Sequence, residues 1–278
     1  MTWINGARSL RNRARPRNDP MTEYKQIRFH VDARVAIVTL SNLPVNAFSK
    51  VMSDELTHCF DFISETEDIR AVVLIGEGKV FCAGADLKGR AGVIKDPGDL
   101  TAHLRRSREC FHSIRECSKP VVAALNGPAL GAGLVLAASA DVLIAAETAS
   151  LGLPEVDVGL MGGAGHASRL FSHSMLRTMA LTGYRVPAAE LFRLGVVNCV
   201  VSQEGLLPRA LEFAHSIAGK SPLAVQLSKQ TLNAIEEMSL RDAYRYEQDM
   251  TIALGKTRDA REAQLAFLEK RPPFFIGQ

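Results

Sequence analysis

The chain has 278 residues, of which 47% are hydrophobic and 23% are charged, a composition typical of a globular protein with one large domain and room for an appendage. No apolar run reaches the roughly 18–20 residues that a membrane-spanning helix needs, so the sequence does not predict a membrane protein. The five cysteines form no CxxC pair and no Cys/His cluster with metal-ligand spacing, which predicts reduced thiols and no metal site.

The first 20 residues are unusually basic. They carry five arginines and one aspartate, a balance of +4, and subtracting it from the +3 of the whole chain leaves −1 for the rest. The remainder therefore lacks the basic excess typical of nucleic-acid-binding proteins. The tail itself fits a mitochondrial transit peptide, a basic arm for nucleic acid, or a disordered extension upstream of a start at Met21. We favour the third interpretation and expect a cytoplasmic protein, with the mitochondrial matrix as the alternative if the tail is a transit peptide.

Short β-branched runs alternate with helical patterns as far as about residue 205. The runs are nearly continuous in apolar residues, as expected of parallel strands buried on both faces, and they cover residues 34–40, 71–75, 121–125, 142–145 and 196–201. Apolar residues recur at helical spacing from Met52 to Ile63 and, more weakly, from Leu104 to Ile114. Pro187 and Gly195 suit the first turn and the end of a further helix. This succession predicts an α/β fold with a parallel or mixed sheet.

No strand is predicted beyond about Leu206. Four consecutive helices are expected instead, over residues 206–219, 222–238, 240–254 and 258–269. The predicted organisation is therefore a disordered basic tail over 1–20, a ββα-rich body over 21–205 and a helical C-terminal region over 206–278.

Three segments rich in small residues are candidate ligand-binding loops. Residues 81–86 come after the strand predicted at 71–75, residues 126–133 follow the next strand and open a helix, and residues 152–165 lie beyond. The first N–H groups of a helix have no partner within it, and two such amides from different loops would form an oxyanion hole for a thioester that becomes enolate-like. The same glycines also fit tight turns and close packing, which their spacing alone favours.

Glu155 is the candidate acid/base, because it lies among the apolar residues of 151–158. Burial would raise its pKa towards neutrality, which suits a group that takes and returns a proton. A glutamate at a strand end that points to solvent or pairs with an arginine is the commoner outcome. Sequence motifs for dinucleotide, P-loop, nucleophile-elbow and zinc-protease sites are missing. Cys82 fits a small buried residue better than a nucleophile.

Taken together, these segments resemble the crotonase (enoyl-CoA hydratase/isomerase) family over about residues 23–275. Residues 81–88 (FCAGADLK) resemble its first oxyanion and coenzyme A loop, 119–141 its second loop and helix, and 152–170 its catalytic-glutamate segment. Residues 186–201 and 267–271 are similar to the helix–turn–strand after the core and to the terminal helix. The resemblance implies an α/β spiral of ββα units with a helical C-terminal trimerisation region, and a homotrimer or a hexamer made of two trimers.

The resemblance also implies roles for single residues. The backbone amides of Ala85 and Ala132 would form the oxyanion hole, and Glu155 would be the acid/base. The coenzyme A moiety would be bound by a larger set: Ala83, Asp86, Leu87, Lys88, Ala47 near the adenine, and Lys270 reaching the coenzyme A of a neighbouring subunit. Coenzyme A would belong to the substrate, an acyl-CoA thioester, with no separate cofactor and no nucleic-acid or membrane partner.

Two departures from the family pattern bear on the reaction. Val135 occupies the position at which family hydratases carry a second glutamate, and Gly163 the position at which dienoyl-CoA isomerases carry an aspartate. Adding water to a double bond asks for two groups, whereas moving the double bond needs one base. We therefore expect isomerisation by proton transfer between Cα and Cγ of an enoyl-CoA.

Three alternatives stay open. One is a 2-enoyl-CoA hydratase in which His166 replaces the missing carboxylate, or in which Asp157 does so from the same face of a strand-like segment as Glu155. The second is a non-catalytic family member that binds acyl-CoA. The third is a hydrolase or decarboxylase on the same scaffold.

Overall fold

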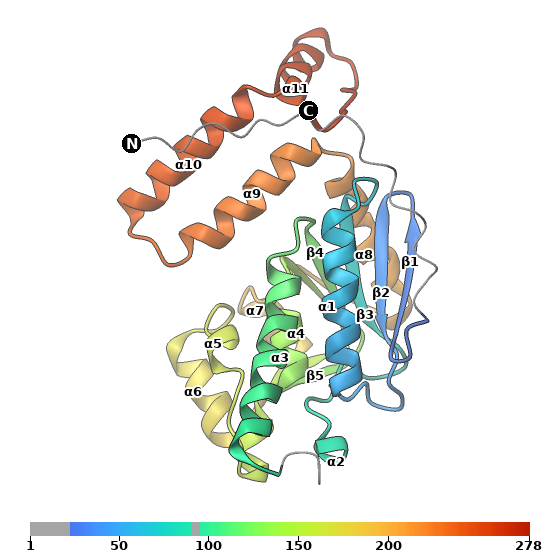
Figure 1. Cartoon of the computed structure of the whole chain (residues 1–278), viewed down its shortest axis with the longest axis vertical. Helices are drawn as coiled ribbons and strands as arrows, with labels where there is room; N and C mark the ends of the chain where they lie inside the picture. The colour runs from blue at the N-terminus through green and yellow to red at the C-terminus, as the bar shows by residue number, and fades with distance from the viewer. Residues whose placement is uncertain (1–22, 91–94) are drawn as a thin grey trace.

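The computed structural model describes residues 23–90 and 95–278, and two β-sheets form its framework (Figure 1). The larger sheet has the order β1-β2-β3-β4-β6-β9, in which β1 is antiparallel to β2 and every later pair is parallel. Its strands are β1 (Ile27–Asp32), β2 (Val35–Leu40), β3 (Ala71–Gly76), β4 (Val121–Leu125), β6 (Val142–Ala146) and β9 (Val200–Val201). The smaller sheet pairs β5 (Pro128–Leu130), β7 (Ser150–Gly152) and β8 (Arg185–Pro187).

Helices cover both faces of the larger sheet. The helices of the body are α1 (Lys50–Glu65), α2 (Leu87–Arg90), α3 (Pro97–Arg115), α4 (Ala132–Ala138), the 3-10 helix η1 (Pro154–Val158), α5 (Ala164–Ala167), α6 (His173–Thr182), α7 (Ala188–Arg193) and α8 (Gln203–Ala218). Three more helices follow: α9 (Pro222–Ile235), α10 (Leu240–Gly255) and α11 (Arg258–Glu269). The α/β class predicted from the sequence is confirmed.

The core has two layers because successive strand residues point to opposite faces of the sheet. Val72 and Leu74 of β3 pack with α1 and α3, whereas Val73 packs on the other face with α8. The burial of each such valine or leucine contributes about 1.5–3 kcal/mol to folding. Helix α8 presents a row of small and apolar residues four apart to the sheet, namely Leu206, Ala210, Ala214 and Ala218. Its packing places α8 with the body rather than with the helices that follow.

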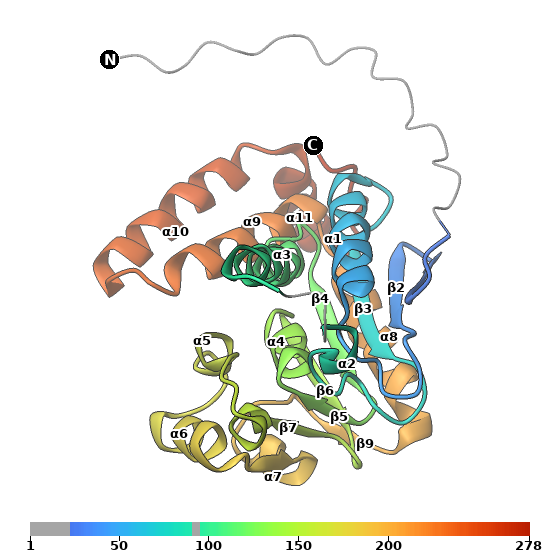
Figure 2. The same cartoon turned by 60° about the horizontal axis from the view of Figure 1, so that its bottom comes forward.

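Helices α9 to α11 project from the body, and α9 and α10 run side by side (Figures 1 and 2). Lys229 of α9 ties this extension to the sheet: its buried ammonium group donates to Asp141 Oδ2 at 2.8 Å and to the Lys119 carbonyl at 3.1 Å. By contrast, α10 has no buried residue in this structure. Large apolar side chains are exposed on the extension and the tail after it, including Leu240 (87%), Phe267 (83%) and Phe274 (77%).

The four C-terminal helices are confirmed, with boundaries that differ from the predicted ones by three residues at most. The strand predicted over 196–201 is wrong except for Val200–Val201. Gly195 has a φ of 72°, and the chain then bends so that the Val196 amide donates to the Leu191 carbonyl at 2.9 Å. A buried bend needs apolar residues as much as a buried strand does, so the pattern does not separate the two.

Three further expectations concern the basic tail, membrane-spanning helices and metal sites. The basic tail predicted over 1–20 lies outside the described residues. Within residues 23–90 and 95–278, no helix is both long and apolar enough to cross a membrane. The same residues contain no cluster of three or more His, Cys, Asp or Glu side chains suited to hold a metal ion.

Candidate active site

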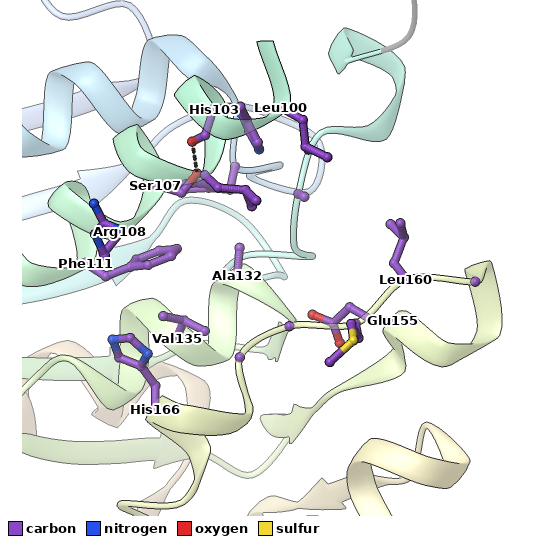
Figure 3. Close-up of a pocket in the computed structure, with 17 residues that line it drawn as sticks. Leu100, His103, Ser107, Arg108, Phe111, Ala132, Val135, Glu155, Leu160 and His166 are labelled. Carbon is purple, nitrogen blue, oxygen red and sulfur yellow. Dashed lines mark hydrogen bonds between the residues drawn. The ribbon is translucent and has the colours of Figure 1, made fainter. Parts of the chain in front are cut away.

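A cavity of about 660 Å³ lies where three distant segments meet (Figure 3). Helix α3 forms one wall, and the start of α4 together with the chain from Glu155 to His166 forms the other. Ala85 completes the cavity from the loop after β3. Because β3 and β4 are parallel neighbours, the loops after them emerge at the same edge of the sheet, which brings Ala85 and Ala132 to one cavity.

The amide of Ala85 is left free by the way its loop is held. The Phe48 amide donates to the Gly84 carbonyl at 2.8 Å, and the Asp86 amide donates to the Phe48 carbonyl at 3.0 Å. This parallel bridge uses the residues on either side of Ala85, so the N–H of Ala85 itself points the other way. No hydrogen bond within residues 23–90 and 95–278 uses that N–H.

The amide of Ala132 is free for a different reason. Ala132 is the first residue of α4, and the first bond of that helix runs from the Val135 amide to the Gly131 carbonyl at 3.1 Å. An N–H in the first turn has no partner within its helix. The two loops are close, since a Cβ atom at Gly84 would lie 3.9 Å from the Ala132 nitrogen. The positions expected to form an oxyanion hole thus bring two free amides to the same cavity.

Glu155 enters the cavity from η1, and its side chain is half-buried. Its Oε2 atom is buried and accepts no hydrogen bond from the described part of the chain. Burial away from water raises the pKa of this carboxyl above its ordinary value of 4.5, and a backbone amide opposes that shift only partly. Among the described residues that line the cavity, Glu155 is the only carboxylate.

Both positions at which the resemblance implies a further carboxylate border the cavity. Val135 lines it and is 4% exposed, and Gly163 also lines it. The two are neighbours, since a Cβ atom at Gly163 would lie 3.1 Å from Val135 Cγ2. The wall beside Glu155 is therefore apolar where a second carboxylate would otherwise be.

The expected placement of Asp157 on the same face as Glu155 is wrong. The segment is a 3-10 helix rather than a strand, so residues two apart lie roughly 240° apart around its axis. Asp157 does not line the cavity; its carboxylate lies against the C-terminus of α6, where a Cβ atom at Gly183 would approach Oδ2 to 2.8 Å. Of the two suggested substitutes for the missing carboxylate, only His166 borders the cavity.

His166 is held at the cavity wall by ring contacts. Its imidazole meets the Phe111 ring edge-on at 5.8 Å between centroids and the His112 ring at 6.2 Å. Burial lowers the pKa of His166 below 6.5, and the positive charges of His112, Arg169 and Arg115 lower it further. The ring is therefore neutral at neutral pH, with one nitrogen as a donor and the other as an acceptor.

Most residues expected to bind coenzyme A lie along one edge next to the cavity. Asp86 caps α2 by accepting from the Gly89 amide at 2.8 Å, and it lines a second cavity of about 450 Å³ that shares Phe48 and His103 with the first. Leu87 and Lys88 are exposed on α2.

The loop before α2 is joined to the turn before α1. The Ala83 amide donates to the Val45 carbonyl at 3.0 Å, and the Ala47 carbonyl in the same turn accepts from Asn42 Nδ2 at 2.8 Å. Lys270 lies apart from them, exposed after the end of α11 with a φ of 55°, and it lines neither cavity.

The wall formed by α3 was not identified from the sequence. It contributes His103, Ser107, Arg108 and Phe111, together with two leucines. The only signal was the spacing of Leu104 and Phe111, which fits any amphipathic helix. Nothing in the sequence shows which chain segment that helix faces.

A family model and individual relatives with similar sequences indicate the same protein family. The family model described as Enoyl-CoA hydratase/isomerase matches residues 30–278. A hydrolase of Mycobacterium tuberculosis, (7aS)-7a-methyl-1,5-dioxo-2,3,5,6,7,7a-hexahydro-1H-indene-carboxyl-CoA hydrolase, is 36% identical over 239 residues, which cover 85% of this chain and 95% of that protein. The 2,3-dehydroadipyl-CoA hydratase of Escherichia coli is 36% identical over 251 residues, or 88% and 96% of the two chains.

A solved structure agrees with these relatives. The enoyl-CoA hydratase of Bacillus anthracis superposes with a TM-score of 0.87 at 32% identity, and the match covers 91% of this chain and 100% of that one. The match over almost the whole chain, with the shared fold, establishes that this protein is an acyl-CoA enzyme of the enoyl-CoA hydratase/isomerase family.

Proposed function

We propose that the protein moves a carbon–carbon double bond in an acyl-CoA thioester, converting a 3-enoyl-CoA to the conjugated 2-enoyl-CoA. The observation that carries this proposal is that Glu155 is the single carboxylate among the described residues lining a cavity, which is bordered by the amides of Ala85 and Ala132, free within the described part of the chain. One base and one oxyanion hole are the groups that such a double-bond shift requires.

In the proposed reaction, Glu155 acts first as a base and then as an acid. Its carboxylate removes a proton from Cα, and the electron pair moves into the thioester to give a dienolate. The amides of Ala85 and Ala132 donate to the oxygen on which negative charge develops. The protonated Glu155 then delivers the same proton to Cγ, and the double bond comes to lie between Cα and Cβ. A pKa raised by burial suits a group that takes and returns a proton, because it makes the carboxylate a stronger base than that of an ordinary glutamate.

A hydratase is the second candidate, and His166 is the observation that favours it. The neutral imidazole lines the same cavity as Glu155 and can hold a water molecule. The Escherichia coli relative is named a hydratase, so its reaction is the natural alternative. Val135 opposes this alternative, because an apolar side chain cannot orient or polarise a water molecule beside Glu155.

We also propose that the protein assembles as a homotrimer, or as a hexamer of two trimers, through α9 to α11. The exposed apolar side chains of these helices support this, since apolar patches on monomers commonly mark interfaces. In such an assembly Lys270 would reach the coenzyme A of a neighbouring subunit. We expect coenzyme A to enter only as part of the substrate and the protein to need no other cofactor.

The test is a direct comparison of two substrates of equal chain length. The purified protein is incubated with a 3-enoyl-CoA and, separately, with the corresponding 2-enoyl-CoA, and products are identified by mass spectrometry. Isomerisation should exceed hydration by about two orders of magnitude, the typical contribution of a general base. Efficient hydration of crotonyl-CoA would overturn the proposal. Release of free coenzyme A would indicate a hydrolase, and binding without turnover a non-catalytic protein.

A further inference from the structure

Several polar side chains line the cavity, and of these the proposed reaction uses only Glu155. Figure 3 shows Glu155 on one side and Arg108, Phe111 and His166 together on the other, with Ala132 between them. The lining also includes apolar side chains, among them Phe48 and Val135, and two further polar ones, His103 and Ser107. An acyl chain whose thioester is held at Ala132 can therefore extend past apolar side chains to the end of the cavity that holds Arg108 and His166.

Arg108 brings a positive charge to that end of the cavity. Its guanidinium contacts Glu109 at 3.2 Å, but both side chains are about 60% exposed, and such surface pairs contribute little. Glu109 does not line the cavity, whereas Arg108 does. The guanidinium therefore keeps donors for a ligand that enters the cavity.

The residues around His166 also favour a ligand oxygen with negative or partial negative charge in this part of the cavity. The positive charges of Arg115 and Arg169 act on His166, and both arginines pair with Glu236, at 2.8 Å each. Among the other acids of this region, Glu116 pairs with His112 at 3.3 Å. None of these carboxylates lines the cavity. The arginines make protonation of His166 unfavourable, and the same field favours an oxygen with negative or partial negative charge beside the ring.

We infer that the protein acts on acyl-CoA thioesters whose acyl group carries a second oxygen function, a carboxylate or a ketone, at the end remote from the thioester, and that Arg108 and His166 bind this oxygen. Arg108 lies one helical turn before Phe111 on α3, so the two side chains share a face of that helix. Phe111 contacts His166 through its ring edge, which brings the guanidinium and the imidazole to the same end of the cavity. The inference deepens the proposed function, since it takes the cavity as the acyl site.

Binding of saturated thioesters tests the inference without any turnover. Isothermal titration calorimetry would compare CoA monothioesters of dicarboxylic acids and of keto acids with those of plain acids of the same carbon number, over four to eight carbons. At one or more lengths, an oxygen-bearing thioester should bind at least about tenfold more tightly, as expected for a charge-assisted hydrogen bond. Plain thioesters that bind equally well at every length would overturn the inference.

Two substitutions identify the residues responsible. Arg108→Gln should lower the preference for the oxygen-bearing thioester by about tenfold, and His166→Phe, which keeps an aromatic ring, should lower it further. Arg105→Gln is the matched control, because Arg105 is exposed on the same helix and does not line the cavity. A preference that survives both changes, or a loss of affinity in Arg108→Gln that is equal for all thioesters, would refute the assignment. The proposed isomerisation is judged separately, by turnover, so failure of one does not imply failure of the other.

Discussion

Gly131 and Glu155 are in such close contact that a Cβ atom at position 131 would lie 2.6 Å from Glu155 Oε1. Gly131 also has a φ of 53°, a conformation that other residues rarely adopt, and it directly precedes the free amide of Ala132. One glycine thus gives space to the proposed base and sets the start of the helix that supplies an oxyanion donor.

Gly131→Ala should therefore lower kcat at least about tenfold, because the new methyl group displaces the carboxylate from its position. Thermal unfolding should also occur at a lower temperature, since alanine at positive φ is strained. Gly195→Ala is the matched control: its φ is 72°, and nothing lies within 4 Å of the added Cβ atom. The control should lose stability and keep its activity. Equal activity of the two variants would show that the contact with Glu155 has no role in turnover.

Glu155→Gln should lower turnover by about 10²–10⁴-fold, the usual cost of losing a positioned acid/base. The glutamine side chain has nearly the same size as that of glutamate, so the Kd of a saturated acyl-CoA should change little. Both quantities can be measured on one preparation, by product analysis and by calorimetry. Near-normal turnover in this variant would assign the proton transfer to another residue.

The pH dependence of turnover should follow the raised pKa of Glu155. The proposed base is active when deprotonated, so kcat/KM should fall as the pH is lowered through that pKa. The acidic limb of the profile should accordingly lie above pH 4.5, the ordinary value for a glutamate. A limb at or below pH 4.5, or the same limb in the residual activity of Glu155→Gln, would contradict this role.

The stability of the fold should also depend on the protonation of Glu155, in a direction that follows from its raised pKa. Because the pKa of Glu155 is higher in the folded than in the unfolded state, the folded state binds more protons between the two values. The favourable contribution of the protonated group is therefore present at low pH and is lost as the pH rises through the folded pKa. Above that pH, Glu155→Gln should melt at the same or a higher temperature than the unmodified protein; a clearly lower melting temperature there would contradict the assigned direction.

Ala132→Pro should remove one oxyanion donor, because proline has no backbone N–H. Loss of one such donor typically costs about 10²–10³-fold in turnover. Proline is well tolerated at the first position of a helix, which is where Ala132 lies, although circular dichroism must first show that the variant folds. Ala132→Gly keeps the amide and should retain substantial activity. If the glycine variant is as inactive as the proline variant, the amide is not the important group.

The accuracy of the sequence-based predictions depended on whether the signal was local. The C-terminal helices were predicted closely because helical spacing repeats along each of them, and Ser221, Ser239 and Thr257 cap three of them. The segment around Glu155 was misjudged, because five residues with proline at the first position fit a short strand or a 3-10 turn equally well. That difference decided which way Asp157 points.

The cavity wall on α3 could not be predicted for another reason. Phe111 contacts His166 only because α3 packs against α4, and no local pattern encodes that packing. Glu155, Ala85 and Ala132 were proposed as site residues from the motifs that resemble the family, and the structure brings all three to one cavity. Their free amides and the unpaired Oε2 atom are properties of the folded chain alone.

The proposal of isomerisation rather than hydration rests most directly on Val135. Its side chain is 4% exposed and lines the cavity that Glu155 enters, at the position where a second carboxylate would activate water. Val135→Glu should therefore raise the rate of hydration of a 2-enoyl-CoA more than the rate of isomerisation of the matching 3-enoyl-CoA. The new carboxylate is unpaired in a largely apolar wall, so the melting temperature should fall.

Val135→Gln is the control that separates the effect of a general base from the effect of a polar side chain that only holds water. Glutamine has nearly the same size as glutamate and can hold a water molecule, but it cannot accept the proton of that water. Both rates should be measured on each variant by mass spectrometry, with folding confirmed by circular dichroism. If hydration rises with glutamate and not with glutamine, the unmodified site lacks a general base for hydration, as the proposed isomerisation requires. An equal rise in both variants would instead show that the site lacked only a place for water, and His166 would then be the base to test.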